Sequence, residues 1–446
     1  MALEILHKEE IGLAQHALAY AQAQGAQQVR LTLTKSLLNL VGVLNGQVDK
    51  VSRALDRSLQ LQLFVDGRYG SFSTNRLDRE SLEAFVREAI GTVRLLEEDA
   101  LRSLPAPERL IRDARDGQEL KLYDSAVESL TAGQRRALAL QSCFWGKAGA
   151  ELLISEEGEY SDSVFDSLTL DSQGLYARHT ETSFEIGYES TVADAEGRHF
   201  SSYWWDATPR MEDLQWAGCA QIACRRALAQ MNPQSVPGGV YKLVVDSECA
   251  SKLVTPLLNA LGGYALQQHN SFLVDSLGEQ VFGENLTLLD LPLTPGETGC
   301  RLFDSEGVAT REMAVVEKGV VKTYFLNTYI ARKMGQEPTI EDATRIQVMP
   351  TGGCQTQEDV LRAVGDGILV TGFNGGNSNP VTGEFSYGIE GFRVCDGHLL
   401  HPVREMLITG DLKTLWNHLL IAADDARPCL SRRIPTLAFS DVSFSA

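Results

Sequence analysis

The chain has 446 residues, of which 43% are hydrophobic and 22% charged, and its formal net charge is −19. This composition is that of an ordinary globular protein, and at about 150 residues per domain the length predicts two or three domains. The acidic balance argues against a dedicated nucleic-acid binder and against docking on anionic lipid, because both need clustered lysine and arginine.

Neither a membrane anchor nor a secretory leader is expected. No apolar run reaches the roughly 18 residues of a membrane span, and the first residues lack the basic-then-apolar layout of a signal peptide. The eight cysteines are scattered and form no CxxC pair, which is typical of a reducing compartment. These features together favour a soluble, cytoplasmic protein.

The first part of the chain predicts two helices with a meander of strands between them. Apolar residues recur at helical spacing over residues 10–23, and leucines alternate with polar residues over 58–65, as in a strand with one buried face. Asn45-Gly46 and Asp66-Gly67 are typical of two-residue hairpin turns, and Asp78 suits the N-cap of the second helix.

Two breaks in composition divide the chain. Residues 101–120 are charged and interrupted by proline, as in a linker, and residues 231–239 are rich in proline and glycine. Between the breaks, the pattern predicts helices near 132–144 and 212–230, with strands within 151–200. The expected units are an N-terminal α/β domain over 1–110, a central domain over 111–235 and a C-terminal domain over 236–446.

The C-terminal domain predicts further hairpins and two helices. A helical stripe over residues 250–261 contains Pro256, and a closing helix over 412–420 follows the N-cap Asp411. Hairpins far outnumber strand–helix–strand units along the chain. The predicted class is therefore α+β, with mostly antiparallel sheets and flanking helices.

The common catalytic signatures are absent from the sequence, which contains no GxSxG, no phosphate-binding GxxxxGK[ST] and no HExxH. His398 and His401 are three apart in a strand-like stretch, so they should lie on opposite faces and not share a metal ion. Cys219 and Cys224 diverge on a helix and are expected to be small core residues. Core packing is also the default expectation for three tryptophans, although they could mark an interface: Trp204, Trp205 and Trp216.

The least ordinary segment is residues 372–392, GFNGGNSNPVTGEFSYGIEGF, which holds six glycines and three asparagines. Such a composition makes a poor packed strand and predicts a loop. The loop is either a long surface excursion or a wall that faces a peptide or another ligand.

Four stretches taken in chain order resemble the TldD/PmbA family, whose members are called modulators of DNA gyrase and are classed as metallopeptidase-related. Residues 44–77 contain LNGQVDKVSRALDRSLQLQLFVDGRYG, and residues 270–282 read NSFLVDSLGEQVF. Residues 301–335 contain FDSEGVATREMAVVEKG, and residues 379–394 read NPVTGEFSYGIEGFRV. The resemblance covers nearly the whole chain and implies the multi-domain architecture of that family.

One branch of this family carries HExxxH on the helix before the SFL stretch, with a cysteine near the C-terminus that completes a zinc site. At the three motif positions this chain has Asn259, Ala260 and Tyr264, which offer two poor ligands and no base. Cys429 lies in the region of the third ligand. The chain therefore resembles the PmbA (TldE) branch, which lacks the motif, and no metal is expected in this chain.

The resemblance implies a subunit of a cytosolic metallopeptidase complex that acts on small peptides or unfolded polypeptides. Zinc is then expected in a TldD-like partner, although a homodimer is the alternative assembly; neither nucleic acid nor membrane is an expected partner. Catalytic residues in this chain are unknown. The residues expected to line a substrate cleft are Asn374, Gly375, Gly376, Asn377, Asn379 and Glu384.

Two other functions remain open from the sequence alone. One is a self-sufficient hydrolase that uses other residues, such as Cys429 with a histidine brought near it by folding. The other is a non-catalytic regulatory or binding protein, in keeping with the gyrase-modulator name.

Overall fold

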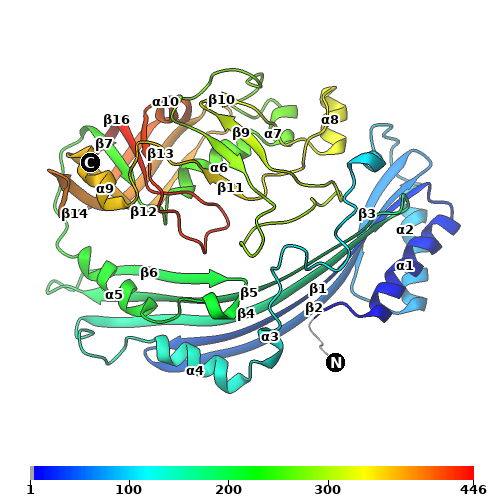
Figure 1. Cartoon of the computed structure of the whole chain (residues 1–446), viewed down its shortest axis with the longest axis horizontal. Coiled ribbons are helices and arrows are strands. Elements are labelled where there is room, and N and C mark those ends of the chain that lie inside the picture. Colours follow the sequence, from blue (N-terminus) through cyan, green and yellow to red (C-terminus); the bar gives the residue numbers. More distant parts are fainter. Residues whose placement is uncertain (1–4) are drawn as a thin grey trace.

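A computed structural model describes residues 5–446, and its first half is built on one large antiparallel sheet (Figure 1). The strand order is β3-β2-β1-β4-β5-β6. The segments before and after the predicted linker thus contribute three strands each to the same sheet. The strands are β1 (Gln28–Leu44), β2 (Gln47–Val65), β3 (Arg68–Thr74), β4 (Leu153–Asp171), β5 (Tyr176–Ala193) and β6 (His199–Thr208).

Helices cover one face of this sheet. Leu31 and Leu33 of β1 belong to the core under α1 and α2, whereas Leu37 and Val41 of the same strand belong to the core under α4. These odd-numbered residues share a face because side chains alternate along a strand. The helical segments are α1 (Lys8–Ala23), α2 (Arg79–Val93), η1 (Pro107–Arg109), α3 (Ala126–Ser129), α4 (Ala132–Ser142), η2 (Met211–Asp213) and α5 (Cys219–Ala229).

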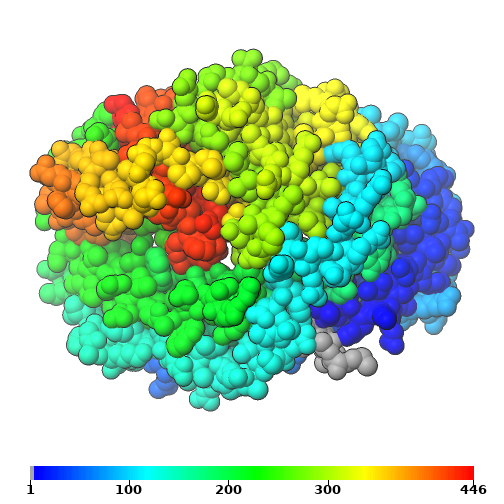
Figure 2. Space-filling model, viewed as in Figure 1, coloured from blue at the N-terminus to red at the C-terminus, as the bar shows by residue number. Residues whose placement is uncertain are grey.

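The segment predicted as a linker over residues 101–120 lies against the C-terminal domain. Leu110 forms an isolated β-bridge with Val308, and the backbone N–H of Ile111 donates to the carbonyl oxygen of Gly307. Leu110 is buried in a small core together with Phe303. Figure 2 shows this segment, in cyan, running across the molecule against the yellow-green surface of the C-terminal domain. The segment is therefore a packed part of the fold that joins the two halves.

The C-terminal domain is organised around a sheet that closes on itself. Its order is β14-β13-β12-β7-β16-β15, and β14 also pairs with β16, so that five strands form a ring and β15 extends it. The strands are β7 (Gly239–Val245), β12 (Gly367–Ser378), β13 (Glu384–Cys395), β14 (His398–Asp411), β15 (Leu419–Ala422) and β16 (Leu437–Ser445).

Beside the ring lies a small four-stranded sheet of order β10-β9-β8-β11. Its strands are β8 (Leu288–Asp290), β9 (Met313–Glu317), β10 (Val320–Val321) and β11 (Ile346–Val348). The helices of this domain are α6 (Ser251–Ala260), α7 (Gly263–Gln267), α8 (Thr328–Met334), α9 (Gln357–Val364) and α10 (Leu412–Asn417). Trp416 and Phe439 are fully buried in the shared core, with their rings edge to face.

Local signals predicted most elements well, and the α+β class with antiparallel sheets is confirmed. Two helices are shorter than predicted. The helix expected over 212–230 begins only at Cys219, because Gly218 precedes it in a left-handed conformation with φ of 84°. The closing helix expected over 412–420 ends at Asn417, and Leu419 then pairs with Phe439 in the sheet.

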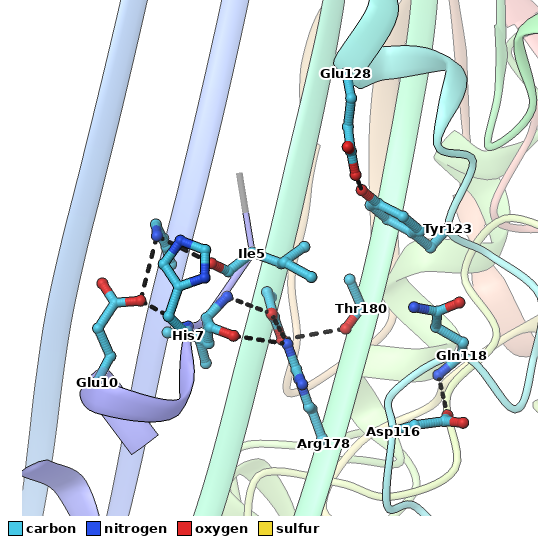
Figure 3. A network of polar contacts seen from close by, with 12 residues as sticks. Ile5, His7, Glu10, Asp116, Gln118, Tyr123, Glu128, Arg178 and Thr180 are labelled. Carbon is cyan, nitrogen blue, oxygen red and sulfur yellow. Dashed lines mark hydrogen bonds and ion pairs between the residues drawn. The ribbon is translucent and has the colours of Figure 1, made fainter. Parts of the chain in front are cut away.

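A buried polar network ties the start of the chain to the large sheet (Figure 3). The Asp166 side chain is fully buried and accepts hydrogen bonds from Arg178 at 2.5 and 3.0 Å. It also accepts from the hydroxyl of Thr180 and from the backbone N–H of Leu6. The charge of this carboxylate is therefore compensated inside the protein, which is the condition for burying it.

As for membrane insertion, within residues 5–446 there is no helix with both the length and the apolar character needed to cross a bilayer.

Candidate functional site: the cavity at the α6–α7 break

The helix that carries the three motif positions is broken. α6 ends at Ala260 and α7 begins at Gly263, with the extended residue Gly262 as its N-cap. Gly263 is packed so closely that a Cβ there would lie 2.8 Å from the carbonyl oxygen of Phe325. The apolar residues predicted to form a helix over 250–261 thus belong to α6, which contains Pro256, and the short helix α7 follows separately.

A cavity of about 690 Å³ opens at this break. Asn259 and Tyr264 both line it, and the Tyr264 side chain is largely exposed. Ala260, at the position where the resemblance places a glutamate, is buried and offers only a methyl group. The two positions at which the resemblance places zinc ligands therefore do lie on one cavity. The side chains present there are the amide of Asn259 and the phenol of Tyr264.

The other side chains around this cavity do not suit a zinc ion. The guanidinium of Arg432 belongs to the lining and donates a hydrogen bond of 2.7 Å to the hydroxyl of Thr255 on α6. Glu341 and Asp342 lie on the same lining, and burial raises the pKa of each carboxyl. Zinc sites combine carboxylates with imidazole or thiolate donors, and no histidine or cysteine among residues 5–446 belongs to this lining; the Arg432 cation would also repel the metal. Within residues 5–446, no three histidine, cysteine, aspartate or glutamate side chains are grouped so that they could hold a metal ion.

The lining of the cavity is largely polar. It has a cationic group, two carboxyl groups and several amides on a wall that also contains the aliphatic Leu258 and Ile330. Sequence reasoning did not identify Arg432, Glu341 and Asp342, because they are far from α6 in sequence and no local pattern marks them.

Cys429 is only three residues before Arg432 but belongs to a different cavity, of about 590 Å³, whose lining includes Trp204 and Arg427. Its thiol is buried, and burial raises its pKa to about 11. A thiol with this pKa is protonated near neutral pH and is a poor nucleophile. No histidine of residues 5–446 belongs to the lining of that cavity, so the geometry gives no support to a Cys429–histidine hydrolase.

The residues predicted to line a cleft lie on a β-hairpin, so the expected loop is wrong. β12 and β13 pair as far as Ser378 and Phe385, and only 379–383 form the turn. The backbone N–H of Phe272 donates to the carbonyl oxygen of Pro380 in that turn, two residues from Asn270, which lines the α6–α7 cavity. The hairpin tip thus approaches the cavity from one side. All six predicted cleft residues are exposed on this hairpin: Asn374, Gly375, Gly376, Asn377, Asn379 and Glu384.

The glycines that suggested a loop are explained by close contacts between strands. A Cβ on Gly376 would lie 2.0 Å from the carbonyl oxygen of Ser386, and one on Gly391 would lie 1.8 Å from that of Leu369. The register of β12 on β13 also shifts between Phe373 and Gly375, which is the sign of a bulge. Glycine is therefore needed for pairing in this hairpin, and its frequency predicted the wrong local structure.

The three tryptophans were expected in the core by default, but each is only half-buried, with Trp204 and Trp216 packed against the margin of a core. Trp204 and Trp205 of β6 are only half-buried and line a cavity of about 610 Å³ between β6, α5 and the C-terminal domain. The Arg427 guanidinium lies 4.1 Å from the ring centre of Trp204 and forms an ion pair of 2.6 Å with Glu248. Cys219 and Cys224 are buried in the core, as predicted.

The buried carboxyl group of Asp304, which accepts a hydrogen bond from the backbone of the cavity residue Glu341, should make the stability of the fold depend on pH. Burial raises the pKa of Asp304 from 3.8 to about 6, and its carboxylate accepts backbone N–H groups of Val308 and Glu341. Because the folded pKa exceeds the unfolded one, the folded protein binds the proton more tightly, and this stabilisation is lost as pH rises from 4 through 6.

We therefore expect the free energy of unfolding of the native chain to fall, relative to that of Asp304→Asn, by about 2.5 kcal/mol between pH 4 and pH 7. Urea unfolding of both proteins at several pH values measures this difference. A difference that stays constant across the window would contradict the raised pKa of Asp304.

These observations define an α+β protein that has a closed C-terminal sheet and a polar cavity where helix α6 is broken from α7. Three family domain models match the chain: PmbA/TldA metallopeptidase domain 1 over residues 33–92, the central domain over 111–231 and the C-terminal domain over 238–446. The chain belongs to the PmbA/TldD family.

Relatives support the assignment over nearly the full length. The Metalloprotease PmbA of Escherichia coli O157:H7 is 26% identical over 420 residues, covering 92% of this chain and 89% of that protein. A crystal structure from Bacteroides thetaiotaomicron, described as a candidate modulator of DNA gyrase, is 38% identical with a TM-score of 0.95 and covers 99% of each chain. TldE from Thermococcus kodakarensis shares the fold, with a TM-score of 0.83 at 18% identity, covering 97% of this chain and all of that one.

Proposed function

We propose that this chain is a cytosolic subunit of a PmbA/TldD-type metallopeptidase complex in which it binds the peptide substrate, while a TldD-like partner provides the zinc ion. The observation that carries the proposal is the lining of the α6–α7 cavity, where Asn259 and Tyr264 stand at the two ligand positions and Arg432 lies on the same wall. Such a cavity suits recognition of a polar chain better than activation of water.

Recognition of a peptide would use both charge and hydrogen bonds. Arg432 offers a partner for a carboxylate, and Glu341 and Asp342 offer partners for amines, on one lining. The exposed amides of Asn374 and Asn377 on the neighbouring hairpin could bind the main chain of an extended peptide. Membership in a family of metalloproteases supports proteolysis as the activity of the complex.

The metal content of the purified chain tests whether the partner, and not this chain, provides the zinc ion. We expect no stoichiometric zinc in this chain alone and a single zinc ion per pair after mixing with a TldD-like chain, with hydrolysis only in the mixture. Elemental analysis and a peptide-cleavage assay measure both. Stoichiometric zinc in the isolated chain, or hydrolysis by it alone, would contradict the proposal.

The role of the hairpin amides has its own test in the reconstituted pair. Asn374→Ala combined with Asn377→Ala is expected to raise KM about tenfold with little change in kcat, because the lost hydrogen bonds serve binding in ground and transition states alike. Asn75→Ala, at an exposed site outside the cavity and the hairpin, is the matched control. Unchanged KM in the double variant would remove the hairpin from the binding site.

A further inference from the structure

The cavity of about 610 Å³ beside Trp204 and Trp205 lies at an edge of the large sheet. β6 is the last strand in the sheet order, so it pairs with β5 on one side and, within residues 5–446, has no strand on the other. In Figure 1 this strand is the part of the large sheet nearest to the C-terminal domain, whose strands β12 and β13 contribute Thr371 and Glu390 to the lining. The volume is in the range of small-molecule sites.

One buried hydrogen-bond acceptor on this lining has no partner. The Gln230 side chain, at the end of α5, is 7% exposed, and its Nε2 donates a hydrogen bond of 3.1 Å to the carbonyl oxygen of Ser201. Because that carbonyl can only accept, it fixes the orientation of the amide, and Oε1 is the atom left without a partner among the described residues. An unpaired buried acceptor is costly, so this position favours a ligand that donates a hydrogen bond.

The charges of the lining favour a donor that is also a cation. Four carboxylates line the cavity against two guanidinium groups, those of Arg226 and of Arg225, which is exposed on α5. Glu189 is exposed and, within residues 5–446, has no ion pair. The other three carboxylates are each paired with an arginine: Asp246 with Arg226 at 3.2 Å, Glu248 with Arg427 at 2.6 Å and Glu390 with Arg404 at 3.5 Å.

The unpaired carboxylate and the unpaired amide oxygen lie along the same stretch of β6. Glu189 is registered with Tyr203 across the β5–β6 pair, and Gln230 bonds to Ser201, two residues before Tyr203. Two residues of a strand span about 7 Å, and their side chains share a face. One small ligand can therefore contact both acceptors and the ring of Tyr203.

Aromatic rings on this strand already hold guanidinium groups. The guanidinium carbons of Arg226 and Arg427 lie 5.2 and 4.1 Å from the ring centre of Trp204. Tyr203, next in the strand, is 51% exposed, and within residues 5–446 no lysine or arginine lies over its ring. A guanidinium is planar and more weakly hydrated than an ammonium group, so it stacks more readily on an aromatic face.

We propose that this cavity binds a guanidinium group, either of a free small molecule or of an arginine side chain in a peptide. Glu189 compensates its charge, Oε1 of Gln230 accepts one of its N–H groups, and the ring of Tyr203 stacks on its plane. The net charge of −19 also favours a cationic ligand. The site goes beyond the proposed function, because it needs neither zinc nor a TldD-like partner and, within residues 5–446, shares no lining residue with the α6–α7 cavity.

Titration calorimetry of the chain alone tests the class of ligand. Acetyl-arginine amide is the probe, and acetyl-citrulline amide is its matched control, because it has nearly the same shape but carries a neutral urea. We expect saturable binding of the arginine compound at one site, and binding of the citrulline compound that is weaker by about tenfold or more. Agmatine distinguishes the two sources: binding as tight as that of the amide indicates a free guanidine, and weaker binding indicates an arginine side chain of a peptide.

Three variants test which residues form the site. Glu189→Gln removes the unpaired charge and Gln230→Met removes the unpaired acceptor, and each should weaken binding of acetyl-arginine amide by about five- to tenfold. Glu80→Gln makes the same change as Glu189→Gln at an exposed site on α2 and should leave the affinity unchanged. Circular dichroism checks that each variant is folded.

Three results would overturn the proposal. They are the absence of saturable binding up to about 10 mM, equal affinity for the arginine and citrulline compounds, and binding that the folded variants Glu189→Gln and Gln230→Met do not weaken. Because Glu189 is exposed, its variant decides the question even if Gln230→Met does not fold. None of these results depends on zinc or on hydrolysis, so a failure here is distinct from a failure of the proposed function.

Discussion

Replacing Asp166 by alanine is expected to lower the free energy of unfolding by about 3–5 kcal/mol. The carboxylate is fully buried and its partner Arg178 is also mostly buried. Removing it leaves an uncompensated guanidinium inside the sheet and withdraws the acceptor that holds the backbone N–H of Leu6. Denaturant unfolding followed by circular dichroism measures the loss.

Two matched variants separate this explanation from a general effect of removing a charge. Arg79→Ala breaks an exposed ion pair with Glu83 and should cost at most about 0.5 kcal/mol. Replacing the buried pair together, as Asp166→Leu/Arg178→Met, should recover much of the loss, because no unpaired charge then remains. A cost for Asp166→Ala as small as that for Arg79→Ala would show that the network does not stabilise the fold.

Replacing Gly376 by alanine is expected to destabilise the C-terminal domain by about 3 kcal/mol or more. Its φ is 91°, a conformation that residues with a Cβ rarely adopt, and the new Cβ would lie 2.0 Å from the Ser386 carbonyl oxygen and 2.7 Å from the Tyr387 Cα. Both are backbone atoms, so β12 and β13 would have to separate. Thermal unfolding and the resistance of the hairpin to proteolysis measure the change.

The control for this variant is another glycine-to-alanine change. Gly12 lies on the exposed face of α1, and a methyl group added there would meet no other atom within 4 Å. Gly12→Ala should therefore stabilise the protein by about 0.5–1 kcal/mol. If Gly376→Ala were as well tolerated, the segment would be a flexible loop after all.

Local signals in the sequence were enough to predict the hairpin turns. Asn45-Gly46 and Asp66-Gly67 both have positive φ at each residue, as their side chains allow. Two helices were predicted too long, because the left-handed Gly218 and the strand pairing of Leu419 were not visible in the apolar pattern. The closure of the C-terminal ring through Leu407 and Ser445 depends on contacts between distant segments, so no local pattern could predict it.

The residues of the candidate site were also only partly predictable from the sequence. The resemblance placed Asn259 and Tyr264 at the two ligand positions, and in the structure both residues line one cavity. Arg432 could not be predicted, because the loop that carries it reaches α6 only through the fold, where it bonds to Thr255. The hairpin was misjudged because glycine permits both loops and tightly packed strands, and only the distance to the neighbouring backbone distinguishes them.

The sharing of one sheet by the first two sequence segments has a consequence for synthesis on the ribosome. β1 pairs with β4 along almost its whole length, from Arg30↔Asp171 to Leu44↔Glu157, yet β4 begins at Leu153. At ordinary translation rates, about 5–20 s pass between the synthesis of the β1–β2 hairpin and the synthesis of β4, the strand that pairs with β1. During that interval its inner edge is open to other nascent chains, so newly made protein should depend on chaperones more than the stability of the finished fold suggests.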